Sequence, residues 1–541
     1  MASAPAATDL AIGAFSDTPP WTVDPDEMIW RRGIDAVRAA TKADVPHLTR
    51  RRIVPPGGRV VVVGARLVAA LAAWYAIERR SGVETTSRAG LSRRLRTAFH
   101  RLGPTYIKLG QILSSGEGIF PEEIVGEFKQ LRDRVPPEPW DVVRRTVELD
   151  LGAPLEEVFE RFDTTALASA SIAQVHAARL LTGEEVVVKV QRAKVSELVH
   201  RDIAAMSWIA PVLVGRIPVS ALANPPALVD LFAETIVEEL DFRLEAQNML
   251  DIANVLVKTG QRSIVVPRPH PKLVTPRVLV MERLDGFSFD DVVGMRAAGI
   301  DTSAVVRAGV VANLEGAVLH GVFHGDLHGG NLFVQPDGRV ALLDYGITGR
   351  LDEPRRLAFL RLLMSGTVNN VRAQFEAFRD LGALPADVDI DELMSDLGVD
   401  QPIRDPLQMT PDELMGEIRD IAKKLLGAGA RFPKELMLFI KNMLFLDAAL
   451  ATLAPDIDLF AEIAHVATYF AETHGERILS DTGIDPRQGR IDLDGVRASM
   501  GLSSDVEGIT HRDLQERRAL IRKRMQDHRR SAGGRLGRRR G

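Results

Sequence analysis

Two short polar segments, separated by an apolar run, constrain this chain more than any other feature. The first is His324-Gly325-Asp326-Leu327-His328-Gly329-Gly330-Asn331, and the second is Asp344-Tyr345-Gly346. Asp326 and Asn331 are five residues apart, and Asn331 and Asp344 are thirteen apart. This is the spacing of a kinase-type catalytic loop, H-x-D-x-x-x-x-N, followed by a metal-binding D-[FY]-G turn. Because the two motifs are in register, a chance pair of surface turns is a weak alternative.

The residue types in these segments match the needs of phosphoryl transfer. That reaction needs oxygen ligands for Mg²⁺ and a carboxylate near the acceptor oxygen, with little covalent chemistry by the protein. Asn331 and Asp344 are the predicted metal ligands, and Asp326 is predicted to orient or deprotonate the nucleophile. The sequence therefore predicts a site for ATP and Mg²⁺.

The composition is that of a folded protein and excludes several kinds of site. The chain has 541 residues, enough for two to four domains, of which 45% are hydrophobic and 26% charged. It contains no cysteine, which excludes disulfides, thiolate nucleophiles and cysteine-ligated metals. The net charge of −5 makes nucleic acid an unlikely partner for the chain as a whole.

Residues 141–284 are predicted to form the smaller, N-terminal lobe of a kinase-like fold. The strand from Glu185 to Val190 contains Val187-Val188-Lys189, the type of strand that supplies a nucleotide-contacting lysine. The stretch from Glu238 to Glu245 is predicted to be helical, with carboxylates on one face. That face is either solvated or contains the partner of Lys189. A buried strand, Val278 to Glu282, is predicted to lead into an adenine-binding hinge at Glu282 and Leu284.

A small-residue loop replaces the glycine-rich loop expected before the Lys189 strand. The sequence there is Ala168-Ser169-Ala170-Ser171-Ile172-Ala173-Gln174, and the G-x-G-x-x-G and Walker patterns are both absent. Without glycine the backbone loses easy access to positive φ. We expect a stiffer loop that covers the phosphates through residues Ala168, Ser169, Ala170 and Ser171.

Residues 285–505 are predicted to form the larger lobe. A hairpin around Pro336-Asp337-Gly338 delivers Asp344, and after Ile347 the chain passes almost directly into a helix from about Glu353. The sequence shows neither an A-P-E motif nor a long activation segment, which argues against a conventional protein kinase. Helices are expected from 369 to 470, including an amphipathic core helix from Lys434 to Leu453.

Two segments precede the lobes: residues 1–57 are predicted to be weakly ordered or helical, and residues 87–135 to be helical. Residues 1–86 form an N-terminal extension with an apolar segment, 60–77, which is interrupted by Arg66. That segment is predicted to be a packed helix, a helix lying on a membrane surface or, least favoured, a membrane span. Residues 87–140 carry the tetrapeptide Lys108-Leu109-Gly110-Gln111, whose lysine could equally be solvated on a helix face.

The C-terminal segment, 506–541, is predicted to be a basic tail. Between Arg512 and Gly541 there are twelve Lys or Arg and three Asp or Glu, a local net charge of +9. A solvated, partly disordered tail, anionic lipid and nucleic acid are the alternatives. Lipid is favoured over nucleic acid because no aromatic residue is interleaved for base stacking.

Taken together, these motifs resemble those of the UbiB family of atypical kinase-like proteins, also called the AarF/ADCK kinases. The resemblance runs from about Leu102 to Leu453 and includes the segment Leu102 to Gln111, the alanine-rich loop and the two metal motifs. It implies an α+β, two-lobed protein-kinase-like fold with an N-terminal helical extension across the cleft. Departures from the family pattern are Gly325, Leu327, Gly329 and Tyr345, whereas the charged residues are kept.

The resemblance also implies roles for individual residues. Lys108 and Gln111 would be regulatory and would face Glu239 and Asp241, which leaves Glu245 as the partner of Lys189. The implied activity is that of a Mg²⁺-ATP-dependent kinase or ATPase in isoprenoid quinone or lipid metabolism, cytoplasmic or peripheral at the inner face of a membrane. The alternative is a nucleotide-binding scaffold that regulates a lipid-pathway complex with negligible turnover.

Overall fold

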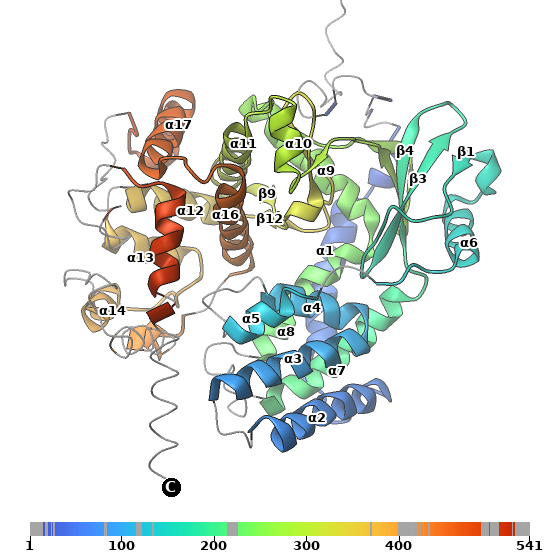
Figure 1. Cartoon of the computed structure of the whole chain (residues 1–541), viewed down its shortest axis with the longest axis horizontal. Coiled ribbons are helices and arrows are strands. Elements are labelled where there is room, and N and C mark those ends of the chain that lie inside the picture. Colours follow the sequence, from blue (N-terminus) through green and yellow to red (C-terminus); the bar gives the residue numbers. More distant parts are fainter. Residues whose placement is uncertain are drawn as a thin grey trace, which may run out of the picture. The chain divides into compact units, whose positions relative to one another are not determined.

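The computed structural model divides into two compact units, each described by itself below (Figure 1). Unit 1 consists of Met1–Gly260, Val265–Asp285 and Ala341–Ile347, and unit 2 of Gln261–Ile264, Gly286–Val340 and Thr348–Gly541. The structure describes residues 15–16, 20–22, 24, 27–79, 84–114, 122–131, 135–213, 225–367, 370–398, 413, 420–421, 424–425, 427–430, 433–487, 497, 508–521 and 523–524. Helices and antiparallel sheets both occur, which confirms the predicted α+β class.

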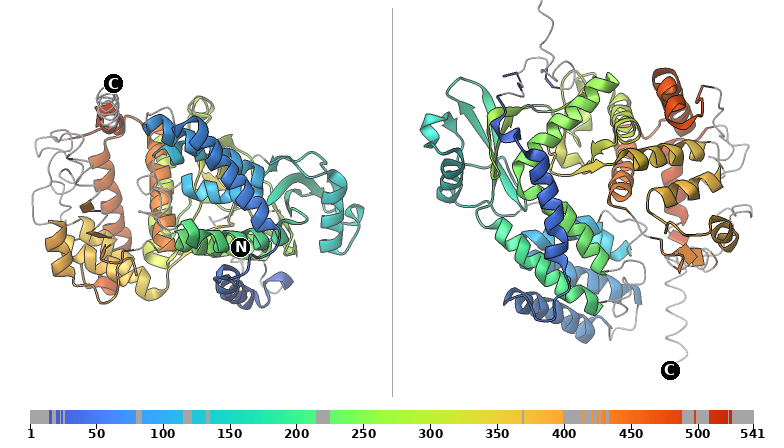
Figure 2. Two further views of the ribbon diagram at one scale, coloured as in Figure 1. Left: turned by 90° about the horizontal axis from the view of Figure 1, so that it is seen from below. Right: turned by 180° about the vertical axis from the view of Figure 1, so that it is seen from behind.

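Unit 1 begins with a group of helices, shown in Figures 1 and 2. Helix α5 (Glu122–Phe128) packs in a small apolar cluster with α3 (Glu84–Leu102) and α4 (Pro104–Ser114). A larger apolar core is shared by α3, α4, α1 (Ile34–Thr49), α2 (Arg59–Ile77), α7 (Val195–Leu213) and α8 (Pro225–Ile236). Ile203 of α7 and Phe232 and Ile236 of α8 are completely buried in this core. Residues 1–140 therefore belong to the same compact unit as the sheet that follows.

A six-stranded antiparallel sheet forms the rest of unit 1. Its strands are β1 (Phe159–Phe162), β2 (Ala168–Ser169), β3 (Ala173–Leu180), β4 (Glu185–Gln191), β6 (Pro269–Val274) and β7 (Val278–Glu282), in the order β1-β3-β4-β7-β6 with β2 on β3. Val186, Val188 and Val190 of β4 pack with α6 (Trp140–Leu151). Because side chains alternate along a strand, Lys189 lies on the opposite face, which is the face of α9 (Phe242–Thr259).

Helix α2 corresponds to the apolar segment of the sequence and is packed on one side only. Val60, Val63 and Ala70 are buried, whereas a second set of apolar side chains is exposed: Val61, Val62, Val68, Tyr75 and Ile77. Three described helices are long and apolar enough to cross a membrane: Arg59–Ile77, Thr302–His320 and Lys434–Leu453. Of these, α2 is the least covered by protein, with 11% of its apolar window buried.

Arg59 fixes the start of α2. Its guanidinium donates to the completely buried Asp202 carboxylate, with Nε 2.5 Å from Oδ1, and to the Leu102 carbonyl at 2.6 Å. Burial raises the pKa of the Asp202 carboxyl, and the Arg59 hydrogen bond opposes that rise. The N-terminal end of α2 is therefore fixed by contacts within the protein.

Unit 2 contains most of the C-terminal helices and two short antiparallel strand pairs. Its elements are β8 (Phe287–Ser288), α10 (Val292–Ala297), α11 (Thr302–Glu315), β9 (Val322–His324), β10 (Leu332–Val334), β12 (Thr348–Arg350), α12 (Glu353–Thr367), α13 (Val371–Asp380), α14 (Ile390–Leu397), α16 (Lys434–Leu453) and α17 (Leu459–Thr482). Strand β10 pairs with β8, and β12 pairs with β9. The boundary between the two units falls within two strands, β5 (Ile264–Val265) and β11 (Val340–Leu342), so each has residues assigned to both units. Leu319, Phe323, Phe359 and Phe439 belong to the core of unit 2.

A tight turn at Gly321 leads from α11 into β9, the strand that precedes the Asp326 loop. We call His324–Asn331 and Asp344–Gly346 the first and second signature segments. A π-helical turn, Gly316–His320, follows α11 and ends at Gly321, whose φ of 65° is left-handed. A Cβ at Gly321 would lie 2.5 Å from the Leu351 carbonyl oxygen. Only glycine fits this conformation and this contact, so the helical segment ends here.

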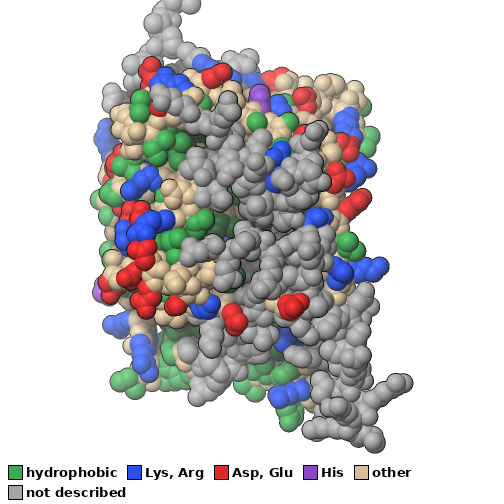
Figure 3. Space-filling view, turned by 90° about the vertical axis from the view of Figure 1, so that its left-hand side faces the viewer, with side chains coloured by type: hydrophobic (Ala, Val, Ile, Leu, Met, Phe, Trp, Pro, Cys, Tyr) green, Lys and Arg blue, Asp and Glu red, His purple; other side chains and the backbone are tan. Residues whose placement is uncertain are grey.

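The C-terminal part of unit 2 is only partly described. Residues 508–521 pack on it through Ile509 and Leu514, and the buried His511 lies 3.2 Å from the Asp447 carboxylate. Most of the predicted basic tail, including residues 525–541, lies outside the described residues. Figure 3 shows acidic and basic side chains interspersed over the described part of one face.

The stretch from Glu238 to Glu245 is not the single helix that the sequence predicts. Glu238–Leu240 is a 3-10 turn, and Asp241 has extended backbone with φ −133° and ψ 104°. The Asp241 side chain accepts a hydrogen bond from the Arg243 N–H and so caps α9. Aspartate favours this N-cap position over a helix interior, so the expected common face of carboxylates does not form.

Candidate active site

In unit 1, a strand and a helix bring together a lysine and two carboxylates. The register of β4 places Lys189 opposite Val175 of β3 and Leu279 of β7. Glu245 lies in the first turn of α9, and its Oε1 is 2.7 Å from Lys189 Nζ. Asp344 Oδ2 is 3.3 Å from the same ammonium. The Lys189 side chain is 12% exposed and that of Glu245 is 3% exposed, so this cluster is largely shielded from water.

Burial and charge have opposite effects on these groups. Burial disfavours the charged form of Lys189, but the Asp344 and Glu245 carboxylates outweigh it and raise its pKa above the ordinary lysine value. Burial raises the pKa of the Glu245 carboxyl, whereas the Lys189 ammonium and the Tyr345 N–H act in the other direction. The two carboxylates therefore keep the Lys189 side chain charged although it is largely buried.

The Asp344-Tyr345-Gly346 turn is fixed by α9. Tyr345 is completely buried, its N–H donates to Glu245 at 3.3 Å, and its carbonyl accepts from Asn248 at 2.9 Å. The Gly346 N–H donates to Asp344 Oδ1 at 2.9 Å, and a Cβ at Gly346 would lie 3.3 Å from both this oxygen and Glu239 Cγ. The Asp344 side chain nevertheless remains 44% exposed, so a ligand can reach it.

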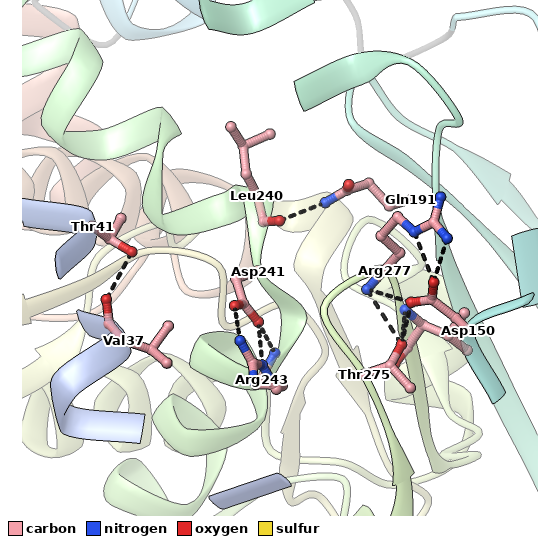
Figure 4. A network of polar contacts seen from close by, with 10 residues as sticks. Val37, Thr41, Asp150, Gln191, Leu240, Asp241, Arg243, Thr275 and Arg277 are labelled. Atoms are coloured by element: carbon pink, nitrogen blue, oxygen red, sulfur yellow. Dashed lines mark hydrogen bonds and ion pairs between the residues drawn. The ribbon is translucent and has the colours of Figure 1, made fainter. Parts of the chain in front are cut away.

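The lysine of the Lys-Leu-Gly-Gln segment lies inside unit 1 and not on a solvated face. Lys108 Nζ of α4 is 2.9 Å from Glu239 Oε1, and both side chains are largely buried. Asp241, the other expected partner, is bound by Arg243 at 2.6 Å, as Figure 4 shows. Gln111 Nε2 donates weakly to the Leu131 carbonyl at 3.4 Å. The structure thus brings Lys108 to one of its two expected carboxylates.

The alanine-rich loop is tied down by an arginine that the sequence reasoning did not single out. Ala168 and Ser169 form β2, and the buried Arg192 donates to the Ala170 carbonyl at 3.0 Å and to Ser169 Oγ at 2.9 Å. Arg192 also donates to the Pro136 carbonyl at 3.0 Å. These bonds explain how a loop without glycine is held; Ser171 next to it is buried. Arg192 lies two residues after the end of the predicted Lys189 strand, and that position is the signal that could have identified it.

The expected hinge residues Glu282 and Leu284 are both buried. The Glu282 carboxylate accepts hydrogen bonds from Ser16 Oγ and from the Arg268 N–H, and burial raises the pKa of its carboxyl. Its side chain therefore contacts the protein itself. Its backbone N–H also donates to the Arg268 carbonyl at 2.8 Å, so a contribution of Glu282 to adenine binding would come from its backbone carbonyl.

In unit 2, the first signature segment forms a compact loop after β9. The Asp326 N–H donates to His324 Nδ1 at 3.1 Å, and Asn331 Nδ2 donates to the Asp326 carbonyl at 3.2 Å. Asn331 ends a 3-10 turn, Gly329–Asn331, in which the His328 ring accepts from the Gly330 N–H. Because the Asn331 amide nitrogen is used in this way, its carbonyl oxygen is the atom left to act as a ligand.

Two residues of α16 contact this loop and were not predicted. Lys441 Nζ pairs with Asp326 Oδ1. The neighbouring Asn442 is completely buried, accepts from the Leu327 N–H at 3.1 Å and donates to the His324 carbonyl and to Asn313 Oδ1. One signal was available in the sequence: Lys441 and Asn442 are the two polar residues between 436 and 446.

Asp344 in unit 1 and Asn331 in unit 2 each offer an oxygen atom of the kind that binds a hard cation. Carboxylate and amide oxygens are ligands that Mg²⁺ accepts, and Mg²⁺ is commonly held by few protein groups together with substrate phosphates. Among the described residues, no three His, Asp or Glu side chains form a closed metal cage. The residues present are thus suited to a metal that shares its coordination with a nucleotide.

This chain is similar to known proteins over most of its length. Residues 130–377 match the ABC1 atypical kinase-like domain. The chain is 34% identical over 407 residues to the probable protein kinase UbiB of Pseudomonas aeruginosa, covering 73% of this chain and 74% of that protein. It is 34% identical over 402 residues to an uncharacterized protein of Mycobacterium tuberculosis, covering 69% and 76%. A solved complex of the Mycobacterium tuberculosis protein Rv3197 with erythromycin matches at 23% identity and a TM-score of 0.38, covering 64% of this chain and 91% of that one.

Proposed function

The chain belongs to the UbiB family of ABC1 atypical kinase-like proteins, and from this premise we propose that it is a Mg²⁺-ATP-dependent atypical kinase or ATPase. The observation that carries the proposal is the nearly dry Lys189 cation between Glu245 at 2.7 Å and Asp344 at 3.3 Å. Such a lysine–glutamate pair next to a metal-type aspartate is the arrangement that kinases use to hold ATP phosphates.

Each site residue has a role in this proposal. Lys189 would contact the α- and β-phosphates, with Glu245 fixing its position, and Asn331 and Asp344 would each provide a ligand to Mg²⁺. When bound, the metal would neutralise charge on the phosphates. Asp326 would orient or deprotonate the attacking group. The loop of residues 168–171 would cover the phosphates, and Glu282 and Leu284 would border the adenine.

The Lys108–Glu239 ion pair supports a regulatory role for the N-terminal helices. Glu239 contacts the Asp344-Tyr345-Gly346 turn closely, since a Cβ at Gly346 would lie 3.3 Å from Glu239 Cγ. We propose that Lys108 restrains Glu239 and, through Glu239, the Asp344-Tyr345-Gly346 turn. Gln111 would fix the segment at Leu131, and Asp241 would fix the start of α9. Releasing this restraint would change turnover or nucleotide preference.

Helix α2 supports a peripheral position on a membrane. Its exposed side chains are mostly apolar, and arginines precede and follow it: Arg50, Arg51, Arg52 and Arg79. A basic and apolar surface of this kind favours an anionic leaflet. The acceptor would then be an isoprenoid or another lipid in quinone or lipid metabolism, at the inner face of a membrane. Flotation with anionic vesicles tests this: recovery of the chain with the vesicles at low salt supports it, and no recovery contradicts it.

The alternative function is a nucleotide-binding scaffold with negligible turnover. The intact set of Lys189, Glu245, Asp326, Asn331 and Asp344 favours the enzyme, because each of these groups has a specific use in phosphoryl transfer. The two functions differ in one measurable respect: both require ATP binding, but only the enzyme releases phosphate or phosphorylates an acceptor.

The test is phosphate release from ATP by the purified full chain, with and without Mg²⁺, using wild type, Asp344→Asn and a matched control. Asp337→Asn is the control because Asp337 lies in the exposed hairpin turn and pairs with Arg339. We expect Mg²⁺-dependent turnover in wild type and Asp337→Asn and a loss of at least about 10²-fold in Asp344→Asn. Binding of Mg²⁺-ATP without turnover in wild type would favour the scaffold. Undiminished turnover in Asp344→Asn would contradict the assignment.

A further inference from the structure

Helix α16 is attached to the Asp326 loop on both sides of the aspartate. Asn442 contacts His324, two residues before Asp326, and Leu327, one residue after it. It is completely buried, and it also donates to Asn313 of α11 at 2.9 Å. These bonds fix the position of α16 along the loop, so the residue before Asn442 has a defined position as well.

That residue is Lys441, and its ammonium contacts the Asp326 carboxylate. Lys441 Nζ pairs with Asp326 Oδ1, and the two side chains are 24% and 17% exposed. The loop itself, from His324 to Asn331, contains no lysine or arginine. The cation at Asp326 is therefore supplied by a helix more than a hundred residues away in the sequence.

The pair is poorly suited to a purely structural role. The pair is partly exposed, so its contribution to stability is smaller than that of a fully buried pair, and the buried Asn442 already holds the helix in register. A preorganised cation beside a catalytic carboxylate has a clear use in phosphoryl transfer. It fixes the carboxylate toward the acceptor and offsets negative charge where the phosphoryl group moves.

We propose that Lys441 is the positioning residue of Asp326, so that α16 supplies the cation that the catalytic loop lacks. This inference rests on the proposed ATP turnover and adds a residue to it. Lys441 acts through Asp326. Its loss should therefore lower the rate of turnover and leave nucleotide binding nearly intact.

The absence of cysteine from the chain allows a direct test on the full-length protein. In Lys441→Cys, alkylation with 2-bromoethylamine forms S-aminoethylcysteine, which restores an ammonium group at nearly the original distance from the backbone. We expect kcat for ATP to fall about 10²-fold in Lys441→Cys, with KM changed less than about threefold. Aminoethylation should recover most of the lost kcat, and Lys441→Arg should retain part of it. Lys434→Cys, on the same helix and treated in the same way, is the matched control.

The outcomes separate this inference from the proposed function. If wild type turns over ATP and Lys441→Cys does so equally well, the inference is wrong and the function stands. A fall in kcat that aminoethylation does not recover, in a variant whose melting temperature is unchanged, also overturns it. An equal loss in Lys434→Cys shows a general effect of altering the helix and contradicts a specific role. A wild-type chain without turnover overturns the proposed function and this inference with it.

Discussion

Two lysines, one in each unit, pair with aspartates of the signature segments, but their surroundings differ. Lys189 lies on a strand between two carboxylates and is nearly buried. Lys441 lies on a helix, pairs with Asp326 and is twice as exposed. A buried charge needs its partners, and removing one leaves the others uncompensated, whereas a pair open to water is nearly neutral for stability. We therefore expect Lys189 to serve both folding and nucleotide binding, and Lys441 to serve the reaction alone.

The largest effect is expected for Lys189→Met. This change leaves Glu245 buried without its cation, and breaking such a pair costs about 3–5 kcal/mol. Urea denaturation of the full chain should therefore show a clear loss of stability, together with a loss of Mg²⁺-ATP binding. Lys441→Met, measured alongside, should lie within about 1 kcal/mol of wild type. Equal stability losses in the two variants would remove the distinction between the two lysines.

A smaller but still substantial loss is expected for Asn442→Ala. Leu327, His324 and Asn313 each lose a hydrogen bond inside unit 2. Buried groups left without partners cost about 1–3 kcal/mol each before water or local rearrangement compensates, so we expect a net loss of about 2–4 kcal/mol. If Asn442→Ala is as stable as wild type, as judged by thermal and urea unfolding, then Asn442 does not hold α16 in register. Lys441 would then have no fixed position beside Asp326.

The smallest effect on activity is expected for Lys108→Ala, which should also lower stability because it leaves the largely buried Glu239 without its cation. Removing the ammonium releases Glu239 beside the Gly346 turn. We expect a change of roughly threefold to tenfold in ATP turnover or in the ratio of ATP to GTP use, in line with the energies of single charge contacts. Lys129→Ala, from the segment after α5, is the control. Identical turnover and nucleotide preference in Lys108→Ala and wild type would show that the ion pair is structural only.

The sequence predicts the parts of the site that carry a local signature. Lys189 follows from its β-branched strand, Asp344 from its turn, and Asp326 and Asn331 from their spacing. The resemblance to a family adds Lys108 with Glu239. In each case the informative residues lie within a few positions of one another or in a recurring pattern, which is why they can be recognised before folding is considered.

The rest depends on contacts between distant segments. Lys441 and Asn442 meet a loop more than a hundred residues earlier, and only the packing of α16 against α11 brings them there. Asp241 shows a local failure of the same reasoning. Helical spacing predicts that the carboxylates between Glu238 and Glu245 share one face. Asp241 instead caps α9, so the segment forms a 3-10 turn followed by α9 and not a single helix.

The most direct test compares Mg²⁺-ATP binding and ATP turnover in wild type, Lys189→Met and Lys441→Met, prepared as full chains under identical conditions. We expect binding and turnover in wild type and neither in Lys189→Met. In Lys441→Met we expect near-normal binding with turnover reduced about 10²-fold. Wild-type binding and turnover in Lys189→Met, or a wild-type chain that binds Mg²⁺-ATP but never releases phosphate, would contradict these expectations.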